Sequence, residues 1–355
     1  MRGRRLCLQV IFPALAVCLA VTAAPVTAAA SLPAGFFGVA PQQPLGAGDL
    51  ARMQGVVGTV RIPVYWWQCE PAPGEYDFGA LDAEIAAAAE RGIRVQPVVY
   101  GTPAWLSAQA ARPPLGRQAM SAWTGFLHEL VRRYGSGGEL WRGRLRRLPV
   151  RLWQVWNEPN FVVFWKPSPN PAAYARLLRA SARAIRSADR RAKIVLAGVA
   201  PVGAGLKTWV FLRRLFRVPG IRHDFDFVAL HPYSATLAEL DYQVRRVRRA
   251  MTQAGLGRLP LLVTELGVAS WGSYPSAFVE GPAGQADFLA AAYRRLLGMR
   301  RRWHIAGVDW YTWRDQAQAD HTCSFCQGAG LLGLNGEPKP AWRAYRRAVK
   351  EAGVR

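Results

Sequence analysis

Hydrophobic positions along the chain form short strand-like runs that alternate with longer helix-like segments. Runs in which apolar and polar residues alternate are typical of strands, and apolar residues spaced three and four apart are typical of amphipathic helices. We expect strands at residues 36–40, 59–65, 94–100, 150–156, 193–199, 225–230, 261–264 and 305–312. We expect helices at residues 50–54, 81–91, 118–134, 171–188, 206–216, 237–254, 285–301 and 340–352.

The order of these elements predicts the fold class. Each expected strand is followed by an expected helix, which is typical of an α/β protein of the (β/α)8 TIM-barrel type. A doubly wound open sheet is the competing architecture, but it does not need eight units, and no Gly-x-Gly-x-x-Gly motif opens the first helix. Since no linker or shift in composition divides residues 31–355, we expect them to form a single domain.

The first thirty residues have the pattern of a secretory signal peptide. Arg2, Arg4 and Arg5 precede an apolar run over residues 6–24, and small residues follow at 28–30. This order predicts cleavage near Ala30 and a secreted, extracellular protein. The alternative is an uncleaved membrane anchor. No other stretch is long and apolar enough to span a membrane, so we expect no stable membrane insertion after cleavage.

The chain of 355 residues is strongly basic, with a formal net charge of +23. Arginines cluster at residues 142–147, 245–249, 294–295 and 300–302. The last three clusters fall in helical patterns, which favours solvated outer helix faces. An anionic partner, such as an acidic polymer, is the alternative. Nothing resembles a nucleic-acid-binding motif, so we expect no nucleic-acid partner.

Three cysteines follow the predicted signal peptide: Cys69, Cys323 and Cys326. Export implies an oxidising setting, in which two of the three can pair. The Cys-x-x-Cys spacing also occurs in redox and metal sites, but no second pair completes a zinc site, and His321 alone does not suffice. A disulfide is therefore expected, either local or between the loops that carry Cys69 and Cys323.

Two glutamates stand where expected strands end. Glu158 follows the strand at 150–156 in the turn-forming sequence Asn157-Glu158-Pro159-Asn160, and Glu265 ends the strand at 261–264. The carboxyl ends of barrel strands meet at one rim, where catalytic residues of this fold gather. Two facing carboxyls, one protonated and one ionised, are what glycoside hydrolysis needs.

Other polar residues are expected at the same rim. Arg61, in the second strand, places a fixed positive charge in the barrel mouth, which keeps a nearby carboxylate ionised. Asn157 is suited to hold a sugar hydroxyl. His231 and Tyr233 end the sixth strand, and the Tyr233 phenol is placed to hydrogen-bond the carboxylate of Glu265. We predict all four as substrate-binding or orienting residues.

Aromatic residues are frequent after the expected strands, and the chain has 14 tryptophans. Sugar rings present flat C–H faces that stack on aromatic rings, so a rim of aromatics favours a carbohydrate cleft. The tryptophans predicted to bind the sugar are Trp66, Trp105, Trp310 and Trp313.

Several motifs resemble those of the clan A retaining glycoside hydrolases, especially families 39 and 5, which include cellulases and β-xylosidases. They are residues 156–160 (Trp-Asn-Glu-Pro-Asn), 61–71, 74–78, 101–105 (Gly-Thr-Pro-Ala-Trp), 264–267 (Thr-Glu-Leu-Gly), 309–315 and 330–341. The resemblance covers nearly the whole mature chain. It implies a (β/α)8 barrel in which Glu158 is the general acid/base and Glu265 the nucleophile, with net retention at the anomeric carbon.

The resemblance implies a secreted β-glycosidase that acts on β-linked oligo- or polysaccharides. It implies no metal and no organic cofactor. The positive charge adds an acidic cell-surface polysaccharide as a candidate substrate. A non-catalytic carbohydrate-binding protein and a transglycosylase on the same fold are the alternative functions.

Overall fold

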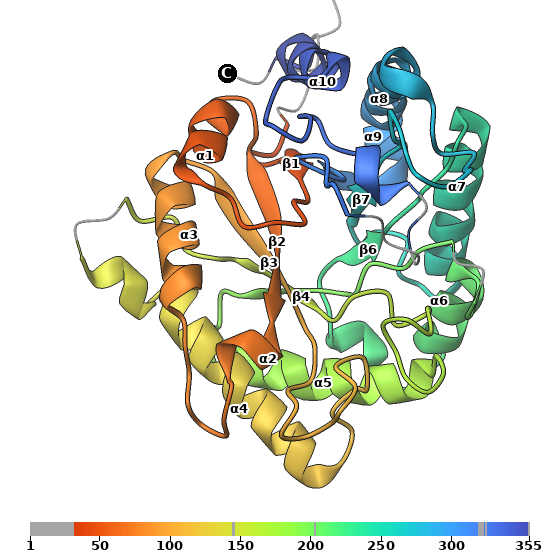
Figure 1. Cartoon of the computed structure of the whole chain (residues 1–355). Helices are drawn as coiled ribbons and strands as arrows, with labels where there is room; N and C mark the ends of the chain where they lie inside the picture. Colours follow the sequence, from red (N-terminus) through yellow and green to blue (C-terminus); the bar gives the residue numbers. More distant parts are fainter. Residues whose placement is uncertain (1–31, 144–145, 202–203, 319–322, 324, 354–355) are drawn as a thin grey trace, which may run out of the picture. The chain divides into compact units, whose positions relative to one another are not determined.

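A closed barrel of parallel strands forms the centre of the computed structural model, which describes residues 32–143, 146–201, 204–318, 323 and 325–353 (Figure 1). Its eight-stranded sheet has the order β5-β4-β3-β2-β1-β8-β7-β6. The strands are β1 (Phe37–Val39), β2 (Thr59–Tyr65), β3 (Arg94–Tyr100), β4 (Leu152–Val155), β5 (Lys193–Val195), β6 (Val228–Leu230), β7 (Leu261–Leu266) and β8 (Ile305–Trp310). Parallel bridges Val195–Phe227 and Val199–Leu230 join the two ends of the sheet.

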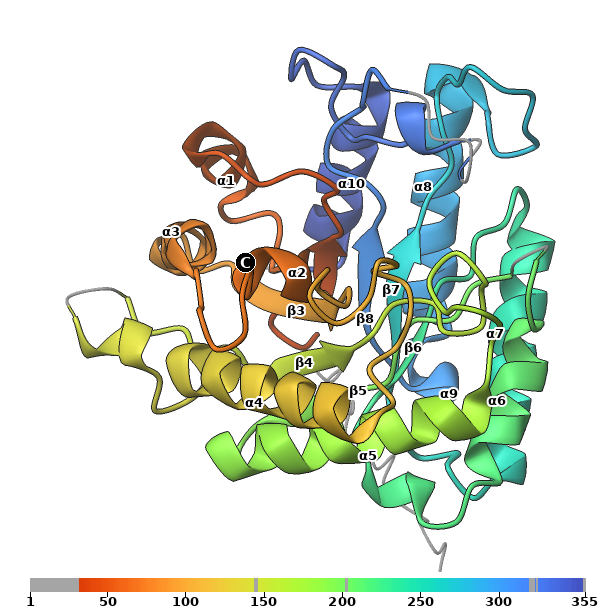
Figure 2. The ribbon, with the colours of Figure 1, turned by 60° about the horizontal axis from the view of Figure 1, so that its bottom comes forward.

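Helices surround the strands as an outer layer, and α4 and α5 lie side by side along one flank (Figure 2). The helices are α1 (Ala47–Met53), α2 (Trp66–Cys69), α3 (Gly79–Glu90), α4 (Arg117–Tyr134), α5 (Pro171–Ala188), α6 (Thr208–Phe216), α7 (Leu237–Gln253), α8 (Gly281–Gly298), α9 (Arg300–Trp303) and α10 (Pro340–Glu351). Short 3-10 turns occur at Glu139–Arg142, Ile221–His223 and Cys326–Gly328. This architecture confirms the predicted (β/α)8 barrel.

Local sequence explains how a typical helix begins and packs. At the start of α5 the Asn170 side chain accepts a hydrogen bond from the Ala173 N–H at 2.9 Å, and Pro171 occupies the first turn, where its missing N–H costs nothing. Leu177 and Leu178 are fully buried against the barrel. Each such side chain contributes about 1.5–3 kcal/mol of burial free energy, which holds the helix layer on the strands.

The structure shifts several expected boundaries. The strands expected at residues 193–199 and 225–230 are shorter, because only Lys193–Val195 and Val228–Leu230 keep ladder pairing. Strand β7 extends beyond Thr264 to Leu266, so Glu265 lies within the strand. The loop expected after the second strand begins as the single helical turn α2.

The N-terminal prediction is not tested by the structure. The predicted signal peptide, residues 1–30, lies outside the described residues. In the part of the chain that the structure describes, no helix combines the length and the apolar character needed to cross a membrane.

Candidate active site

Glu158 reaches the cavity through a sharply turned segment after β4. Trp156 and Glu158 both have positive φ angles, 70° and 38°, a conformation that costs non-glycine residues about 1–3 kcal/mol each. The Glu158 N–H donates to the Gly198 carbonyl at 3.0 Å, which ties this segment to the chain after β5. Strained backbone of this kind is concentrated at functional sites, where the surrounding structure holds it in place.

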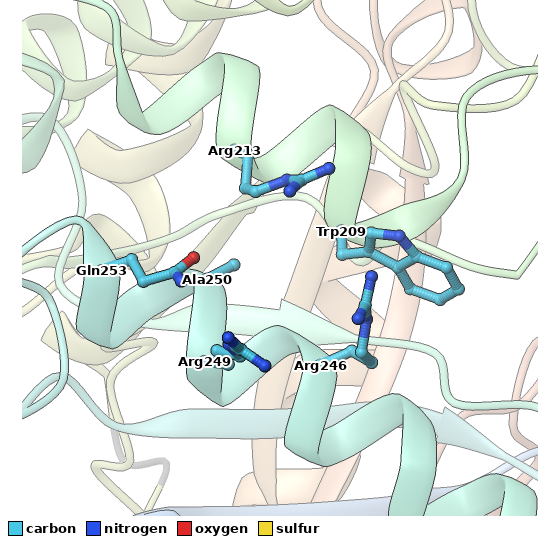
Figure 3. Close-up of a pocket in the computed structure, with 6 residues that line it drawn as sticks. All are labelled: Trp209, Arg213, Arg246, Arg249, Ala250 and Gln253. Atoms are coloured by element: carbon cyan, nitrogen blue, oxygen red, sulfur yellow. The ribbon is translucent and has the colours of Figure 1, made fainter.

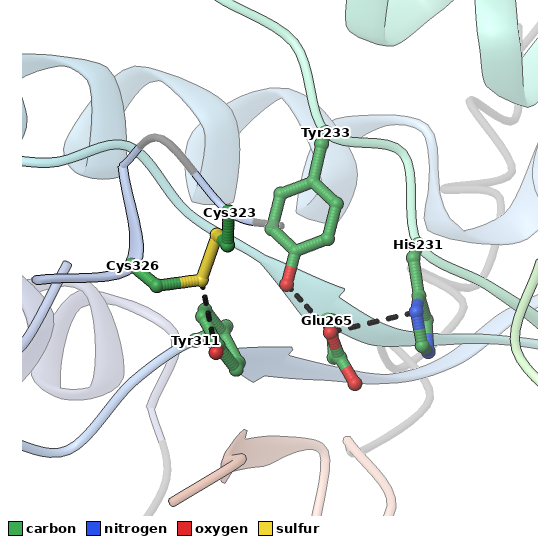
Figure 4. Close-up of a disulfide and its surroundings, with 6 residues drawn as sticks. All are labelled: His231, Tyr233, Glu265, Tyr311, Cys323 and Cys326. Atoms are coloured by element: carbon green, nitrogen blue, oxygen red, sulfur yellow. Dashed lines mark hydrogen bonds and ion pairs between the residues drawn. A yellow bond between two sulfur atoms is a disulfide. The ribbon is translucent and has the colours of Figure 1, made fainter. Parts of the chain in front are cut away.

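Glu265 stands opposite, on β7, and is held by two donors. The Tyr233 hydroxyl donates to Oε2 at 2.5 Å (Figure 4). The Arg61 guanidinium donates to Oε1 at 2.7 Å. Glu158 and Glu265 are 7% and 8% exposed. Carboxylate oxygens of the two lie within 4.8 Å of one another. The fold therefore brings together the two glutamates that were expected at the strand ends.

Arg61 connects both glutamate-bearing strands. Besides its ion pair with Glu265, it donates to the Gln154 Oε1 at 2.7 Å and to the Asn157 Oδ1 at 2.9 Å. All of these side chains are buried. Arg61 thus fixes the orientation of Glu265 and Asn157 together. Gln154 was not predicted as a site residue, although it is the one polar residue of the strand Leu152–Val155.

His231 lies between the two carboxyls and is fully buried. Its Nδ1 is 2.7 Å from the Glu158 Oε1 and 3.5 Å from the Glu265 Oε2. Its Nε2 has no hydrogen-bond partner among the described residues and faces Gly198, where a Cβ would lie 1.9 Å away. Because Nδ1 faces carboxylate oxygens, we assign the ring proton to Nδ1.

The surroundings shift the pKa values of the two carboxyls in opposite directions. Burial raises the pKa of Glu158 and outweighs the hydrogen bond from His231. Burial acts to raise the pKa of Glu265 as well, but electrostatic interactions with His231 and Arg61 and the hydrogen bonds from Tyr233 and Arg61 prevail, so this pKa is lowered. The opposite shifts favour Glu158 as the carboxyl that holds a proton and Glu265 as the one that is ionised.

A third carboxyl lies nearby in the barrel interior. Asp309 is on β8, and its burial raises its pKa to about 8; Arg61 opposes this shift and Glu265 adds to it. Asp309 is therefore largely protonated at neutral pH and adds little charge beneath the two glutamates.

The carboxyls open into a cavity of about 510 Å³. Three of the four predicted polar residues, Arg61, Asn157 and Tyr233, line it together with the two glutamates, whereas His231 does not. Tyr100 of β3 also lines it and was not among the predicted binding residues. The aromatic side chains of the lining are tyrosines and phenylalanines: Tyr65, Tyr100, Phe161, Phe164, Tyr233, Phe278, Tyr311 and Phe325.

The four tryptophans predicted to bind sugar do not line this cavity. Trp66, Trp310 and Trp313 are 0–2% exposed and belong to the hydrophobic core, and Trp105 packs against that core. Two of their indole N–H groups donate hydrogen bonds to Glu70: that of Trp66 to the side-chain carboxylate and that of Trp105 to the backbone carbonyl. We correct the prediction accordingly: these residues support the fold behind the cavity and do not form its surface.

A disulfide between Cys323 and Cys326 forms part of the cavity wall (Figure 4). Phe325, inside this small ring, packs against Tyr233 with ring centroids 5.0 Å apart. The Tyr311 hydroxyl contacts the Cys326 sulfur at 3.1 Å. Of the pairings left open by the sequence, the local one is formed. Cys69 is buried and unpaired.

Glu158, His231 and Glu265 also have the spacing of a metal-ligand set, since one ligand atom of each lies within 4.8 Å of the others. The Arg61 guanidinium already holds Glu265 at 2.7 Å, and a cation placed among the three side chains would be close to this positive charge. The arrangement fits proton transfer and carboxylate chemistry better than metal binding.

By sequence, the chain has a distant relative among known enzymes. No family model matches the chain. Over 222 residues it is 28% identical to a β-xylosidase of Geobacillus stearothermophilus, an alignment that spans 55% of this chain and 41% of the relative. The chain therefore matches less than half the length of that relative.

Solved structures show the same barrel. A GH39 enzyme from Xanthomonas axonopodis pv. citri superposes with a TM-score of 0.67 at 21% identity, over 89% of this chain and 66% of that one. A GH5_18 structure from Streptomyces cattleya in complex with GlcNAc gives 0.67 at 19% identity, over 87% and 74%. These findings confirm the resemblance to glycoside hydrolase families 39 and 5. The fold and the site together define a (β/α)8 barrel with paired glutamates at the carboxyl ends of its strands.

Proposed function

We propose that the chain is a retaining β-glycosidase in which Glu158 is the general acid/base and Glu265 the nucleophile. One observation carries the proposal: two buried carboxyls from β4 and β7 come within 4.8 Å in one cavity, with pKa values shifted apart. Retaining enzymes hold their carboxyls about 5–5.5 Å apart, whereas inverting enzymes need about 6.5–9.5 Å to admit a water. The separation supports retention.

The site residues then have defined roles in a double displacement. Glu265, ionised, attacks the anomeric carbon while Glu158 gives its proton to the leaving oxygen, and the glycosyl–Glu265 ester forms. Glu158, now a carboxylate, takes a proton from water, and that water breaks the ester and restores Glu265. Arg61 and Tyr233 keep Glu265 oriented and ionised, and Asn157 is placed to hold a sugar hydroxyl.

The substrate we propose is a β-linked sugar, with β-xylosides as the first to test because the curated relative is a β-xylosidase. The tyrosines and phenylalanines of the cavity offer ring faces for a sugar, and the opposed pKa shifts favour turnover over binding alone. We propose that the protein acts outside the cell, on the basis of its N-terminal sequence.

A panel of aryl β-glycosides, led by the xyloside, tests the activity. We expect wild type to turn over at least one member and Glu265→Gln to turn over none. Glu158→Gln should keep its first step only with substrates whose leaving group needs no proton, such as dinitrophenyl glycosides. Asp315→Asn is not a suitable control because Lys339 depends on that carboxyl. Arg343→Ala, an exposed change on α10, is a suitable one.

Trapping locates the nucleophile. An activated 2-fluoro sugar should label Glu265, and peptide mass mapping identifies the labelled residue. Labelling of another residue would overturn the assignment of the nucleophile. Binding of sugars without any turnover across the panel would instead favour a carbohydrate-binding protein.

A further inference from the structure

A second hollow lies on the outer surface, between α6 and α7, away from the paired glutamates. It has a volume of about 170 Å³ and is lined by Trp209, Arg213, Arg246, Arg249, Ala250 and Gln253 (Figure 3). The spacing explains the lining: Trp209 and Arg213 are four apart on α6, and Arg246, Arg249 and Gln253 recur at intervals of three and four on α7. Each helix therefore turns one stripe toward the groove.

Aromatic rings hold one of the three guanidinium groups in place. The Arg246 guanidinium lies 4.9 Å from the centroid of the Trp209 ring and 5.7 Å from that of Tyr242. The two rings themselves meet edge to face, with centroids 5.7 Å apart. Stacking of this kind orients the planar guanidinium group and leaves its N–H edge free to donate to a ligand.

Among the described residues the three groove arginines have no acidic partner, whereas some arginines elsewhere on the helix layer do. Arg179, Arg186 and Arg295 each pair with an aspartate. Within the described part of the chain, no ion pair joins Arg213, Arg246 or Arg249 to a carboxylate. Three like charges around one hollow repel each other, so the groove gains most from an anionic ligand.

We propose that this groove, which we call the α6–α7 arginine groove, binds the carboxylate groups of an acidic polysaccharide. The guanidinium fork matches a carboxylate with two parallel hydrogen bonds, and a groove between two helices admits a chain. The choice of a polysaccharide rests on the proposed function. The groove would bind the polymer outside the catalytic cavity and would not take part in bond cleavage. Binding there would raise the concentration of the polymer near the cavity.

Binding to polygalacturonate, a polymer of uronate units, tests the proposal on the full chain. The variant Arg213→Ala/Arg246→Ala/Arg249→Ala should bind about tenfold more weakly than wild type in dilute buffer, and the difference should diminish as salt screens the charges. Fully methyl-esterified polygalacturonate has the same backbone without the charge, so wild type should bind it as weakly as the variant binds the acid form.

A matched control separates the groove from net charge. The variant Arg176→Ala/Arg183→Ala/Arg343→Ala removes three exposed arginines from α5 and α10 and should bind polygalacturonate as wild type does. An equal loss in the control would overturn the groove. Duplex DNA of similar charge density that binds equally well, with an equal loss in the groove variant, would overturn the choice of a polysaccharide.

Hydrolysis of the aryl glycoside is measured on the same samples. All three proteins should turn it over equally, because the groove arginines do not line the catalytic cavity. If wild type does not hydrolyse any aryl glycoside, the proposed function is wrong, and the binding result can still be interpreted by itself.

Discussion

The ion pair between Arg61 and Glu265 gives a prediction whose size follows from burial. The two side chains are 4% and 11% exposed, and Arg61 has two further acceptors, Gln154 and Asn157. Removing one partner of a buried pair leaves a charge without compensation and typically costs about 3–5 kcal/mol. We therefore expect Arg61→Met, which keeps much of the side-chain volume, to lower the free energy of unfolding by about 3–5 kcal/mol at neutral pH.

A double-mutant cycle isolates the part of this cost that belongs to the pair. Arg61→Met, Glu265→Gln and the double variant are compared with wild type by urea unfolding, followed by tryptophan fluorescence and circular dichroism. Because a hydrogen bond to a charged group contributes about 1.5–3 kcal/mol, the coupling free energy should be about 2 kcal/mol at neutral pH.

The pH dependence gives the decisive comparison. The folded state lowers the pKa of Glu265, so its contribution to stability is complete above the unfolded pKa of about 4.3 and is lost as pH falls through the folded value. The coupling should therefore shrink in acid. A coupling near zero at neutral pH, or one that does not change with pH, would refute this account of how Arg61 keeps Glu265 ionised.

Three other changes test the site. Tyr233→Phe removes the donor that lowers the pKa of Glu265, so the acid limb of the kcat/KM profile should move to higher pH; an unmoved limb would contradict the role. Phe325→Ala should raise KM up to about tenfold with kcat less affected, and reducing the disulfide in wild type should act in the same direction. An equal fall in kcat would contradict the role of Phe325 as part of the cavity wall. Gly198→Ala places a Cβ against the His231 ring, and kcat should fall about a hundredfold while the protein still unfolds cooperatively; unchanged kcat would show that the ring can move freely.

The sequence was sufficient to place the two glutamates, because parallel barrel strands bring their carboxyl ends to one rim whatever the side chains between them. It also located Arg61 correctly, since alternation along β2 puts this charge on the inner face. Period-two alternation along β8 could have excluded Trp310 as a sugar-binding residue. Asp309 faces the barrel interior near Arg61, so its neighbour Trp310 must point outward, where its N–H donates to the Ala329 carbonyl.

The other cavity residues depend on contacts that no local pattern encodes. The turn α2 packs Trp66 against α4 and away from the cavity, where Glu70 accepts its N–H, and nothing in the preceding strand signals this turn. Phe325 reaches the cavity because Cys323 and Cys326 close a small ring around it. If the disulfide pairing had been known, it would have indicated that Phe325 lies in the cavity wall, but three cysteines allow more than one pairing.

The position of His231 has a consequence for how charge moves during the proposed cycle. Before the first step the negative charge sits on Glu265, and after it the charge sits on Glu158, because one carboxyl has become an ester and the other has given up its hydrogen. A single imidazole N–H within 2.7 Å of one and 3.5 Å of the other can follow that charge by a small tilt of the ring. Each half of the reaction would thereby be served by the same donor.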